Sequence, residues 1–462
     1  MFDRTTYIER RKRLSHDLGS GLILFPGNTE APMNYLDNQY PFRQDSSFLY
    51  FWGLDTPDLA AIVDVDERRD TLYGDDFTVD EIVWRGPQKT VAERAAEAGV
   101  ATTAPRSALQ QTLAEALRLG RRVHFLPQYR GENAILLEHL LGIRAASVNQ
   151  HASVPLIKAV VAQRSIKSTA EVGQIETALE TTREMHVLAM TRARPGVYER
   201  EIAGAMEGLV VSRDVRLAFP IIFSIHGETL HNHHHGNRME AGQMAVNDSG
   251  AESPFHYASD ITRTIPIGGR FVGAQRDLYL AVRRAQVRAI DAIKPGVRHK
   301  DVHLLACRSL AEDLKALGCM RGDLDAAVEA GAHALFFQCG LGHMMGFDVH
   351  DMEGIGEQYV GYDDTVERSQ QFGLRSLRLG RTLQPGFVVT TEPGVYFIPE
   401  LIDMWKAQHK FDEFINYEAV EEFRRFGGIR IEDNVLVTGT GHRVLGPPIP
   451  VEIDEVEQLA SG

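Results

Sequence analysis

Residues 247–264 read NDSGAESPFHYASDITRT and place two aspartates, Asp248 and Asp260, at the ends of two strand-like runs joined by a turn. Apolar residues precede the first aspartate and a β-branched run follows the second, so folding would tend to bury both carboxylates. A buried carboxylate is costly unless a positive charge satisfies it. Two converging carboxylates therefore indicate a bound cation, whereas an isolated aspartate at a turn is more often a capping residue.

A second acidic pair occurs in similar settings, with Glu392 in TTEPGVYF (390–397) and Glu432 in GGIRIEDNV (427–435). Carboxylates suit hard or borderline divalent ions, and one added imidazole is typical of manganese, cobalt, iron or zinc sites. The stretch CGLGHMMGFDVHD offers His343 and His350 among glycines that allow close backbone approach. The residues alone predict a carboxylate-rich metal site, but they do not identify which histidine is its ligand.

The run HNHHHGN (231–237) contains further histidines that could be taken for a metal site, namely His231, His233, His234 and His235. Adjacent histidines in a loop rich in asparagine and glycine usually point in different directions. We therefore expect most of this run to be solvated.

The second part of the chain contains a weak internal repeat. ARPGV at 193–197 resembles IKPGV at 293–297, and GQMAVNDSG at 242–250 resembles GFVVTTEPG at 386–394. In the second pair, a glycine begins an apolar strand that reaches a carboxylate six residues later. Chance is an alternative, because Pro-Gly turns between helices are common. A true repeat predicts two similar halves of helices and strands facing each other, with the site between them.

The length of 462 residues and an apolar content of 44% favour two domains. Residues 1–165 alternate strand-like runs, such as GLILF and AAIVDV, with helical patterns, which predicts an α/β domain. Ser168, with Glu171 three positions on, predicts the start of a long amphipathic helix. We place the domain boundary just before it, with the second domain over 166–462.

The net charge of −14 disfavours nucleic acid and membrane surfaces as partners. The three cysteines, an odd number in a long chain, favour free thiols in a reducing compartment. The charged first 14 residues lack the apolar core of a secretory signal, and no apolar run approaches about 18 residues. These features predict a soluble cytoplasmic protein.

Taken together, the motifs resemble those of the prolidase and aminopeptidase P family, the M24 metallopeptidases with the pita-bread fold. YIERRKRL (7–14) and YPFRQDSSFLYFWGL (40–54) resemble the family's non-catalytic first domain, and the chain from about 166 resembles its catalytic domain. The resemblance implies an α/β N-terminal domain followed by an α+β pita-bread domain, the pseudo-symmetric two-half creatinase and aminopeptidase fold.

The resemblance also implies the ligand roles. Asp260 and Glu432 would bridge two divalent ions, Asp248 would complete the coordination of one ion, and His343 and Glu392 would complete the other. Manganese is the ion implied first, with cobalt, zinc or iron as alternatives. Two such ions share a water, lower its pKa and hold a hydroxide against the scissile carbonyl.

Other positions match family residues around the substrate. His231 and His350 would flank it as catalytic residues, and Glu392 would also shuttle the water's proton. Arg430 would hold the acidic ligands, and Arg378 matches an arginine that grips the free carboxylate of a dipeptide in prolidases. A surface charge is the alternative role for Arg378.

Two positions depart from the family pattern. Cys339 stands four residues before His343, where the family usually has a histidine, so substrate contacts near the leaving group are expected to differ. The interval from Asp248 to Asp260 is one residue longer than usual, which a bulge in the connecting hairpin would absorb.

The resemblance implies hydrolysis of the bond before proline, whose nitrogen carries no hydrogen and whose ring fixes φ. Xaa-Pro aminopeptidase activity on peptides is expected first and Xaa-Pro dipeptidase activity second. The non-peptidase alternatives are a metal-free binding protein and a creatinase-like C–N hydrolase on the same fold. The resemblance further implies proline-containing di- or oligopeptides as substrates and a homodimer or homotetramer.

Overall fold

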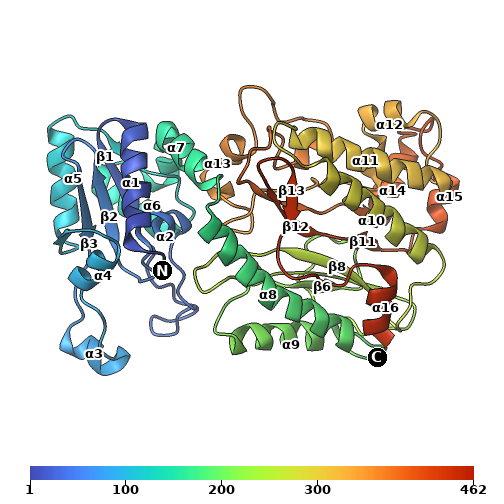
Figure 1. The fold of residues 1–462 in the computed structure, drawn as a ribbon, viewed down its shortest axis with the longest axis horizontal. Coiled ribbons are helices and arrows are strands. Elements are labelled where there is room, and N and C mark those ends of the chain that lie inside the picture. Colours follow the sequence, from blue (N-terminus) through green and yellow to red (C-terminus); the bar gives the residue numbers. More distant parts are fainter. Residues whose placement is uncertain (462) are drawn as a thin grey trace. The chain divides into compact units, whose positions relative to one another are not determined.

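The structure, a computed structural model, describes residues 1–461 as two compact units (Figure 1). The first unit comprises Met1–Arg164 together with the short segment Met352–Tyr359. The second comprises Ser165–Asp351 and the chain from Val360 onward. The first division lies one residue from the predicted boundary. The sequence did not predict that residues 352–359 would group with the first unit.

The second unit carries all the candidate ligands. Its helices are α8 (Thr169–Arg192), α9 (Glu199–Ser212), α10 (Ala274–Ala292), α11 (His299–Ala316), α12 (Leu324–Ala330), η2 (Ala332–Leu335), η3 (Leu374–Ser376), α14 (Pro399–Ala407), α15 (Tyr417–Glu422) and α16 (Ile453–Ser461). Its strands are β6 (Ile222–Ser224), β7 (Met244–Ser249), β8 (Ile261–Pro266), β9 (Val388–Thr391), β10 (Gly394–Tyr396), β11 (Gly428–Arg430), β12 (Asp433–Val437) and β13 (His442–Val444). They form three antiparallel sheets in the orders β6-β7-β8, β13-β12-β9 and β10-β11.

The start of α8 is the one predicted from the sequence. The Ser168 hydroxyl accepts a hydrogen bond from the Glu171 amide (3.3 Å), and the Glu171 carboxylate accepts one from the Ser168 amide (2.9 Å). This reciprocal pair satisfies two amides that the first helical turn leaves free. Helix α8 then packs on β7 and β8, while α10 packs on β9, β10 and β11.

The sequence repeat corresponds to a repeated set of backbone hydrogen bonds. The Gly196 amide donates to the Met239 carbonyl (2.8 Å), and the Gly296 amide donates to the Leu383 carbonyl (3.0 Å). Both glycines have positive φ, 93° and 86°, which a side chain would disfavour. Met239 lies just before β7 and Leu383 just before β9. Each Pro-Gly turn therefore ties a helix pair to a strand that leads to a carboxylate.

The hairpin between β7 and β8 shows where the extra residue of the Asp248–Asp260 interval lies. Its paired residues run from Met244↔Pro266 to Ser249↔Ile261, and the isolated Glu252↔Ala258 bridge keeps the same register. The turn closes beyond that bridge, where the Ser253 amide donates to the Tyr257 carbonyl (2.8 Å). Equal numbers of residues lie on the two strands, so the expected bulge is not found between them.

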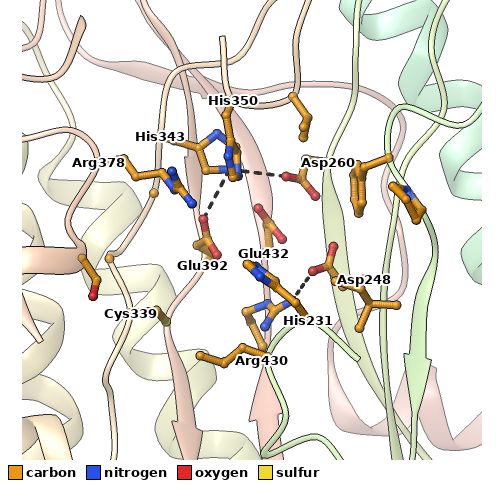
Figure 2. Close-up of a pocket in the computed structure, with 18 of the residues that line it drawn as sticks. His231, Asp248, Asp260, Cys339, His343, His350, Arg378, Glu392, Arg430 and Glu432 are labelled. Carbon is orange, nitrogen blue, oxygen red and sulfur yellow. Dashed lines mark hydrogen bonds and ion pairs between the residues drawn. The ribbon is translucent and has the colours of Figure 1, made fainter. Parts of the chain in front are cut away.

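Strands from the two halves of this unit meet at β8 and β11. The Glu432 amide donates to the Thr262 carbonyl (3.1 Å), and the Thr264 hydroxyl donates to the Arg430 carbonyl (3.0 Å). The acidic side chains of both halves converge at this junction (Figure 2).

The first unit is an α/β domain, as predicted. Its helices are α1 (Arg4–Leu18), α2 (Ser46–Trp52), α3 (Val79–Arg85), α4 (Val91–Glu97), α5 (Ala108–Arg118), α6 (Gly131–Leu141), η1 (Ala145–His151), α7 (Val154–Arg164) and α13 (Glu353–Val360), whose last residue belongs to the second unit. Its strands are β1 (Leu22–Pro26), β2 (Ala60–Asp64), β3 (Arg69–Tyr73), β4 (Thr102–Ala104) and β5 (Val123–His124), in the sheet order β4-β3-β2-β1-β5.

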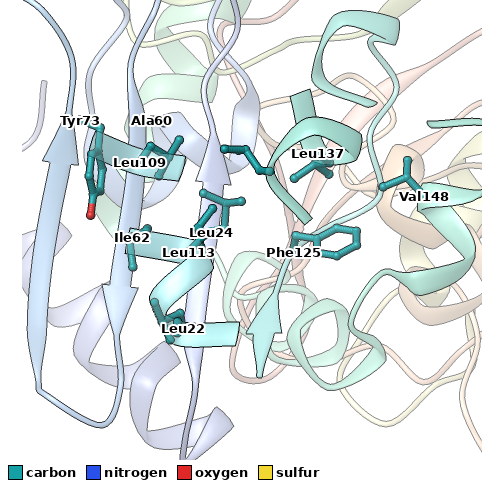
Figure 3. Packing of buried hydrophobic residues seen from close by; sticks show 12 residues of the cluster. Leu22, Leu24, Ala60, Ile62, Tyr73, Leu109, Leu113, Phe125, Leu137 and Val148 are labelled. Atoms are coloured by element: carbon teal, nitrogen blue, oxygen red, sulfur yellow. The ribbon is translucent and has the colours of Figure 1, made fainter. Parts of the chain in front are cut away.

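One face of that sheet forms a core with two helices (Figure 3). Leu22 and Leu24 of β1 lie against Leu109 and Leu113 of α5, with Leu137 contributed by α6. Across residues 1–461, no helix is long and apolar enough to cross a bilayer.

Candidate metal centre

The five candidate ligands lie in strands or in the segments next to strands. Asp248 lies in β7, Asp260 precedes β8, Glu392 follows β9 and Glu432 joins β11 to β12. His343 lies on a loop beside β9, where its amide donates to the Thr390 hydroxyl (3.0 Å). Figure 2 shows all five side chains directed into one space. The structure thus brings together the residues that the sequence predicted as ligands.

His343 is oriented toward two of the carboxylates. Its Nε2 lies 3.4 Å from Asp260 Oδ2 and 3.5 Å from Glu392 Oε1. Its Nδ1 lies 3.1 Å from the carbonyl oxygen of Met344. With Nδ1–H donating to that carbonyl, the Nε2 lone pair faces the carboxylates, which is the arrangement of a metal-binding imidazole.

The donor set fits divalent cations. Three buried carboxylate oxygens have no hydrogen-bond partner, namely Oδ1 of Asp248, Oδ1 of Asp260 and Oε1 of Glu432. A buried, unpaired polar atom is destabilising by about 1–3 kcal/mol, and more when charged. Ligand atoms of Asp260, His343 and Glu432 all lie within 4.8 Å of one another. Cations bound between these oxygens would satisfy atoms that the protein leaves unpaired.

The carboxyl groups strongly perturb one another's ionisation in the metal-free chain. Burial, reinforced by the charge of Asp248, raises the pKa of Asp260 well above its usual range. Burial, together with the charges of Asp260 and Glu392, likewise raises the pKa of Glu432. Burial also raises the pKa of Glu392. Clustered carboxyls with raised pKa values mark a place where positive charge is expected.

The buried side chain of Arg430 donates hydrogen bonds to this cluster. Its Nη2 donates to Asp248 Oδ2, and its Nε donates to the Thr262 hydroxyl (3.0 Å). Thr262 in turn donates to Glu432 Oε2 (2.7 Å), while Arg430 Nη1 reaches the Tyr396 hydroxyl (3.3 Å). Sequence reasoning missed Thr262 and Tyr396, because both are ordinary strand residues. Their only signal is their position two and four residues after a candidate ligand.

Asn434 is a second supporting residue that the sequence analysis missed. Its side chain accepts from the Asp260 amide (3.1 Å) and donates to the Asp260 carbonyl (2.6 Å). These two hydrogen bonds fix the backbone at Asp260, where the loop of the hairpin ends and β8 begins. Asn434 is fully buried and follows Glu432 by two residues, on the same strand face.

The ligands line a pocket of about 420 Å³ that also contains the other predicted residues: His231, Cys339, His350, Arg378 and Arg430. The ring of His350 lies 4.2 Å from that of His343 between centroids. Partial burial, followed by the nearby charge of Arg430, lowers the pKa of His231. Cys339 Sγ lies 4.0 Å from the Tyr396 hydroxyl, and burial raises the pKa of its thiol to about 12.

The apolar part of the pocket wall was not predicted. It is formed by Phe219, Pro220, Ile222, Leu230 and Val349. An apolar wall beside charged ligands suits a substrate with a compact hydrocarbon group next to the reacting bond.

Most of the histidine run is exposed, as expected. His233 and His234 are exposed, and His235 Nε2 contacts the Ile221 carbonyl (3.1 Å). His233 also lines the pocket together with His231.

A family model described as metallopeptidase family M24 matches residues 173–439, more than half of the chain. The chain belongs to metallopeptidase family M24. A second model, the aminopeptidase P N-terminal domain, matches residues 7–124. Membership of this M24 family implies divalent metal ions, and the second unit has its pita-bread fold.

Relatives of this M24 chain extend over its full length. It is 31% identical to the human Xaa-Pro dipeptidase, over all of this chain and 92% of that protein. It is 32% identical to a probable Xaa-Pro aminopeptidase of Fusarium vanettenii, over 96% of this chain and 92% of the relative. A solved aminopeptidase from Pseudomonas aeruginosa superposes with a TM-score of 0.82 at 26% identity, covering 100% and 98% of the two chains.

Proposed function

We propose that this M24 enzyme hydrolyses the bond before proline at the N-terminus of peptides, as an Xaa-Pro aminopeptidase. The observation that carries the proposal is the convergence of three buried carboxylates, the partly buried Glu392 and His343 beside an apolar pocket wall. In the same proposal, residues 1–165 form the aminopeptidase P-like domain and 166–462 form the catalytic domain.

In the proposed site, Asp260 and Glu432 would be shared by two ions, Asp248 would complete the coordination of one, and His343 with Glu392 would complete the other. The buried, unpaired oxygens of Asp248, Asp260 and Glu432 support metal binding by these three residues. We propose manganese as the native ion, since an oxygen-rich set with a single imidazole suits it.

Such ions, when bound, lower the pKa of a coordinated water and polarise the scissile carbonyl. The chain's residues supply the rest. Glu392 would accept the water's proton, and burial raises the pKa of its carboxyl above its usual value. His350 and His231 donate hydrogen bonds to the developing oxyanion and to the leaving nitrogen. Their place on the pocket wall supports these roles.

Two parts of the pocket position the proline side of the substrate. The apolar wall packs against the proline ring and keeps water away from the reacting bond. Proline offers no amide hydrogen, so a site that recognises its shape accepts what other peptidases reject. Cys339 occupies the leaving-group side with a neutral thiol, since burial raises its pKa to about 12.

Xaa-Pro dipeptidase activity is the second candidate, and Arg378 favours it. Arg378 lines the pocket and could pair with the free carboxylate that a dipeptide presents immediately after its proline. Relatives of both activities match the chain over nearly its full length.

The deciding experiment compares hydrolysis of matched Xaa-Pro, Xaa-Pro-Yaa and Xaa-Ala-Yaa peptides by manganese-loaded and chelator-treated protein. We expect metal-dependent cleavage of both proline peptides, with higher kcat/KM on the tripeptide, and little cleavage of the alanine peptide. A strong preference for the dipeptide would overturn the aminopeptidase assignment. If neither proline peptide were cleaved by metal-loaded protein, both assignments would fail.

We further propose a cytoplasmic location and a homodimer or homotetramer. The three cysteines are all free thiols, which supports a reducing compartment. The oligomer is supported by family resemblance, and sedimentation of the purified protein tests it directly.

A further inference from the structure

A second group of metal-ligand side chains lies outside the M24 pocket. His303 and Cys307 occupy α11, and His333 lies in η2. One ligand atom from each lies within 4.8 Å of the other two. All three residues are buried, and none lines the pocket of the candidate metal centre.

Helix geometry places the first two ligands together. Residues four apart lie on the same helix face, so His303 and Cys307 present their side chains in one direction. His303 Nε2 lies 3.4 Å from Cys307 Sγ. Bonds of about 2.1 Å to nitrogen and 2.3 Å to sulfur, at a tetrahedral angle, put two zinc ligands about 3.6 Å apart. The pair is therefore already spaced as zinc ligands.

The histidines have ring nitrogens without hydrogen-bond partners. Both nitrogens of His333 and Nδ1 of His303 are buried and unpaired. The backbone of Val328 acts on His333 as a hydrogen-bond partner and raises its pKa, but the contact lies outside good hydrogen-bond geometry. Leaving buried polar atoms unpaired is destabilising, and packed core histidines normally avoid it. A poorly satisfied ring nitrogen of His333 beside the His303–Cys307 pair is an independent sign that a ligand belongs there.

Burial also keeps the imidazoles in their coordinating form. It lowers the pKa of His333 to about 4 and that of His303 well below its usual value. Both rings are therefore neutral near pH 7, with a lone pair available on one nitrogen.

We propose that His303, Cys307 and His333 form a separate zinc site. Binding replaces the thiol proton of Cys307, which leaves to solvent, with one sulfur–zinc bond, and adds two nitrogen–zinc bonds. The fourth position takes a water molecule. Thiolate and imidazole favour zinc over manganese, so the two sites differ in the ions they select.

The site would fasten α11 to the segment that carries the pocket. His333 begins a stretch that continues through Cys339 to the candidate ligand His343. Burial raises the pKa of the Cys307 thiol well above its usual value, and an electrostatic interaction with Cys339, in the same stretch as His333, adds to this effect. A zinc ion holding His333 would limit the movement of this stretch without contacting substrate.

Cobalt substitution tests the proposal. Thiolate-bound cobalt has an intense near-ultraviolet charge-transfer band, and the five candidate M24 ligands include no cysteine. We expect this band in cobalt-loaded wild-type protein, its loss in Cys307→Ser, and its retention in Cys319→Ser, a matched buried cysteine elsewhere. Retention in Cys339→Ser excludes the pocket thiol as its source. No thiolate band in the wild type would overturn the proposal, even if no variant folded.

Metal analysis gives a second readout. In a chain carrying Asp260→Asn and Glu432→Gln, which weakens the M24 site, we expect about one zinc per chain to survive dialysis. Adding His333→Gln should remove that zinc. Survival of the zinc after both His333→Gln and Cys307→Ser, in folded protein, would contradict the assignment. These outcomes are independent of peptide cleavage, so they stand or fall separately from the proposed function.

Discussion

Arg430 donates a hydrogen bond from Nη2 to Oδ2 of Asp248, joining the two halves of the second unit beneath the candidate metal centre. The bond occupies one carboxylate oxygen and leaves Oδ1 directed into the pocket without a protein partner. A ligand held in this way is positioned before any ion arrives. The guanidinium therefore sets both the charge balance and the geometry of the site.

Replacing Arg430 with lysine is expected to weaken metal binding. Lysine keeps the charge but loses the fork that contacts Asp248 and Thr262 together. Loss of such outer contacts typically lowers metal affinity or activity by about 10–100-fold. Manganese titration followed by activity measures the change. Arg424→Lys, in an exposed pair with Asp403, is the control, and equal affinity in the two variants would contradict the prediction.

The metal-free protein should lose stability as pH rises. The folded-state pKa values of Asp260, Glu392 and Glu432 are raised, chiefly by burial, so the folded chain binds more protons than the unfolded chain. Stability is therefore retained below the unfolded carboxyl pKa of about 4 and falls as pH rises through the higher folded values. Chemical denaturation of chelator-treated protein across this range measures the trend.

Asp260→Asn isolates one of these carboxyls. In the metal-free state we expect the variant to be more stable than wild type at pH 7, with the difference shrinking toward pH 4. With metal the order should reverse, because the variant loses a ligand. The exposed Asp364→Asn is the control and should show neither effect. A metal-free variant less stable than wild type at pH 7 would show that another contact of Asp260 dominates.

Cys339 should react slowly with alkylating reagents. Burial, with the charge of Glu392, raises the pKa of its thiol to about 12, so little thiolate exists near pH 7. The labelling rate should rise about tenfold per pH unit below that pKa. Mass spectrometry of iodoacetamide-treated protein between pH 7 and 10 follows each cysteine. Labelling of Cys339 that is rapid at pH 7 and does not accelerate toward pH 10 would show that its thiol is activated.

Arg378→Gln should separate the two peptidase activities. Loss of a charge-assisted hydrogen bond to a free carboxylate is worth about 1.5–3 kcal/mol, or about 10–150-fold in kcat/KM. We expect a fall of that size for Xaa-Pro dipeptides and a clearly smaller one for Xaa-Pro-Yaa peptides. Arg375→Gln, exposed and near Phe372, is the neighbouring control. Equal losses on both substrates would exclude carboxylate recognition by Arg378.

The sequence predicted those parts of the molecule that depend on local pattern. The Ser168 cap, the strands leading to Asp248 and Glu392, and the α/β first unit all follow from hydrophobic spacing and capping chemistry. Features that depend on contacts between distant residues could not be predicted from the sequence. In the sequence Asn434 looks like an ordinary strand residue, and only the structure shows that its side chain bonds both backbone groups of Asp260.

The same limit applies to the hairpin and to α11. The bulge was expected because interval length alone does not say whether a ladder or its turn takes an extra residue. His303 and Cys307 follow ordinary helical spacing. Only the position of His333 beside them, known from the structure, makes them candidate metal ligands.

The Pro-Gly turns that anchor both helix pairs also bear on the origin of the enzyme. Each half repeats the same hydrogen-bonded frame, yet one delivers Asp248 and the other delivers Glu392. If the two halves arose by duplication, a single half would have supplied only part of the donor set, and two copies would have been needed to enclose the ions. The two carboxylate strands would then have changed independently, which accounts for the different ligands on the two sides of the centre.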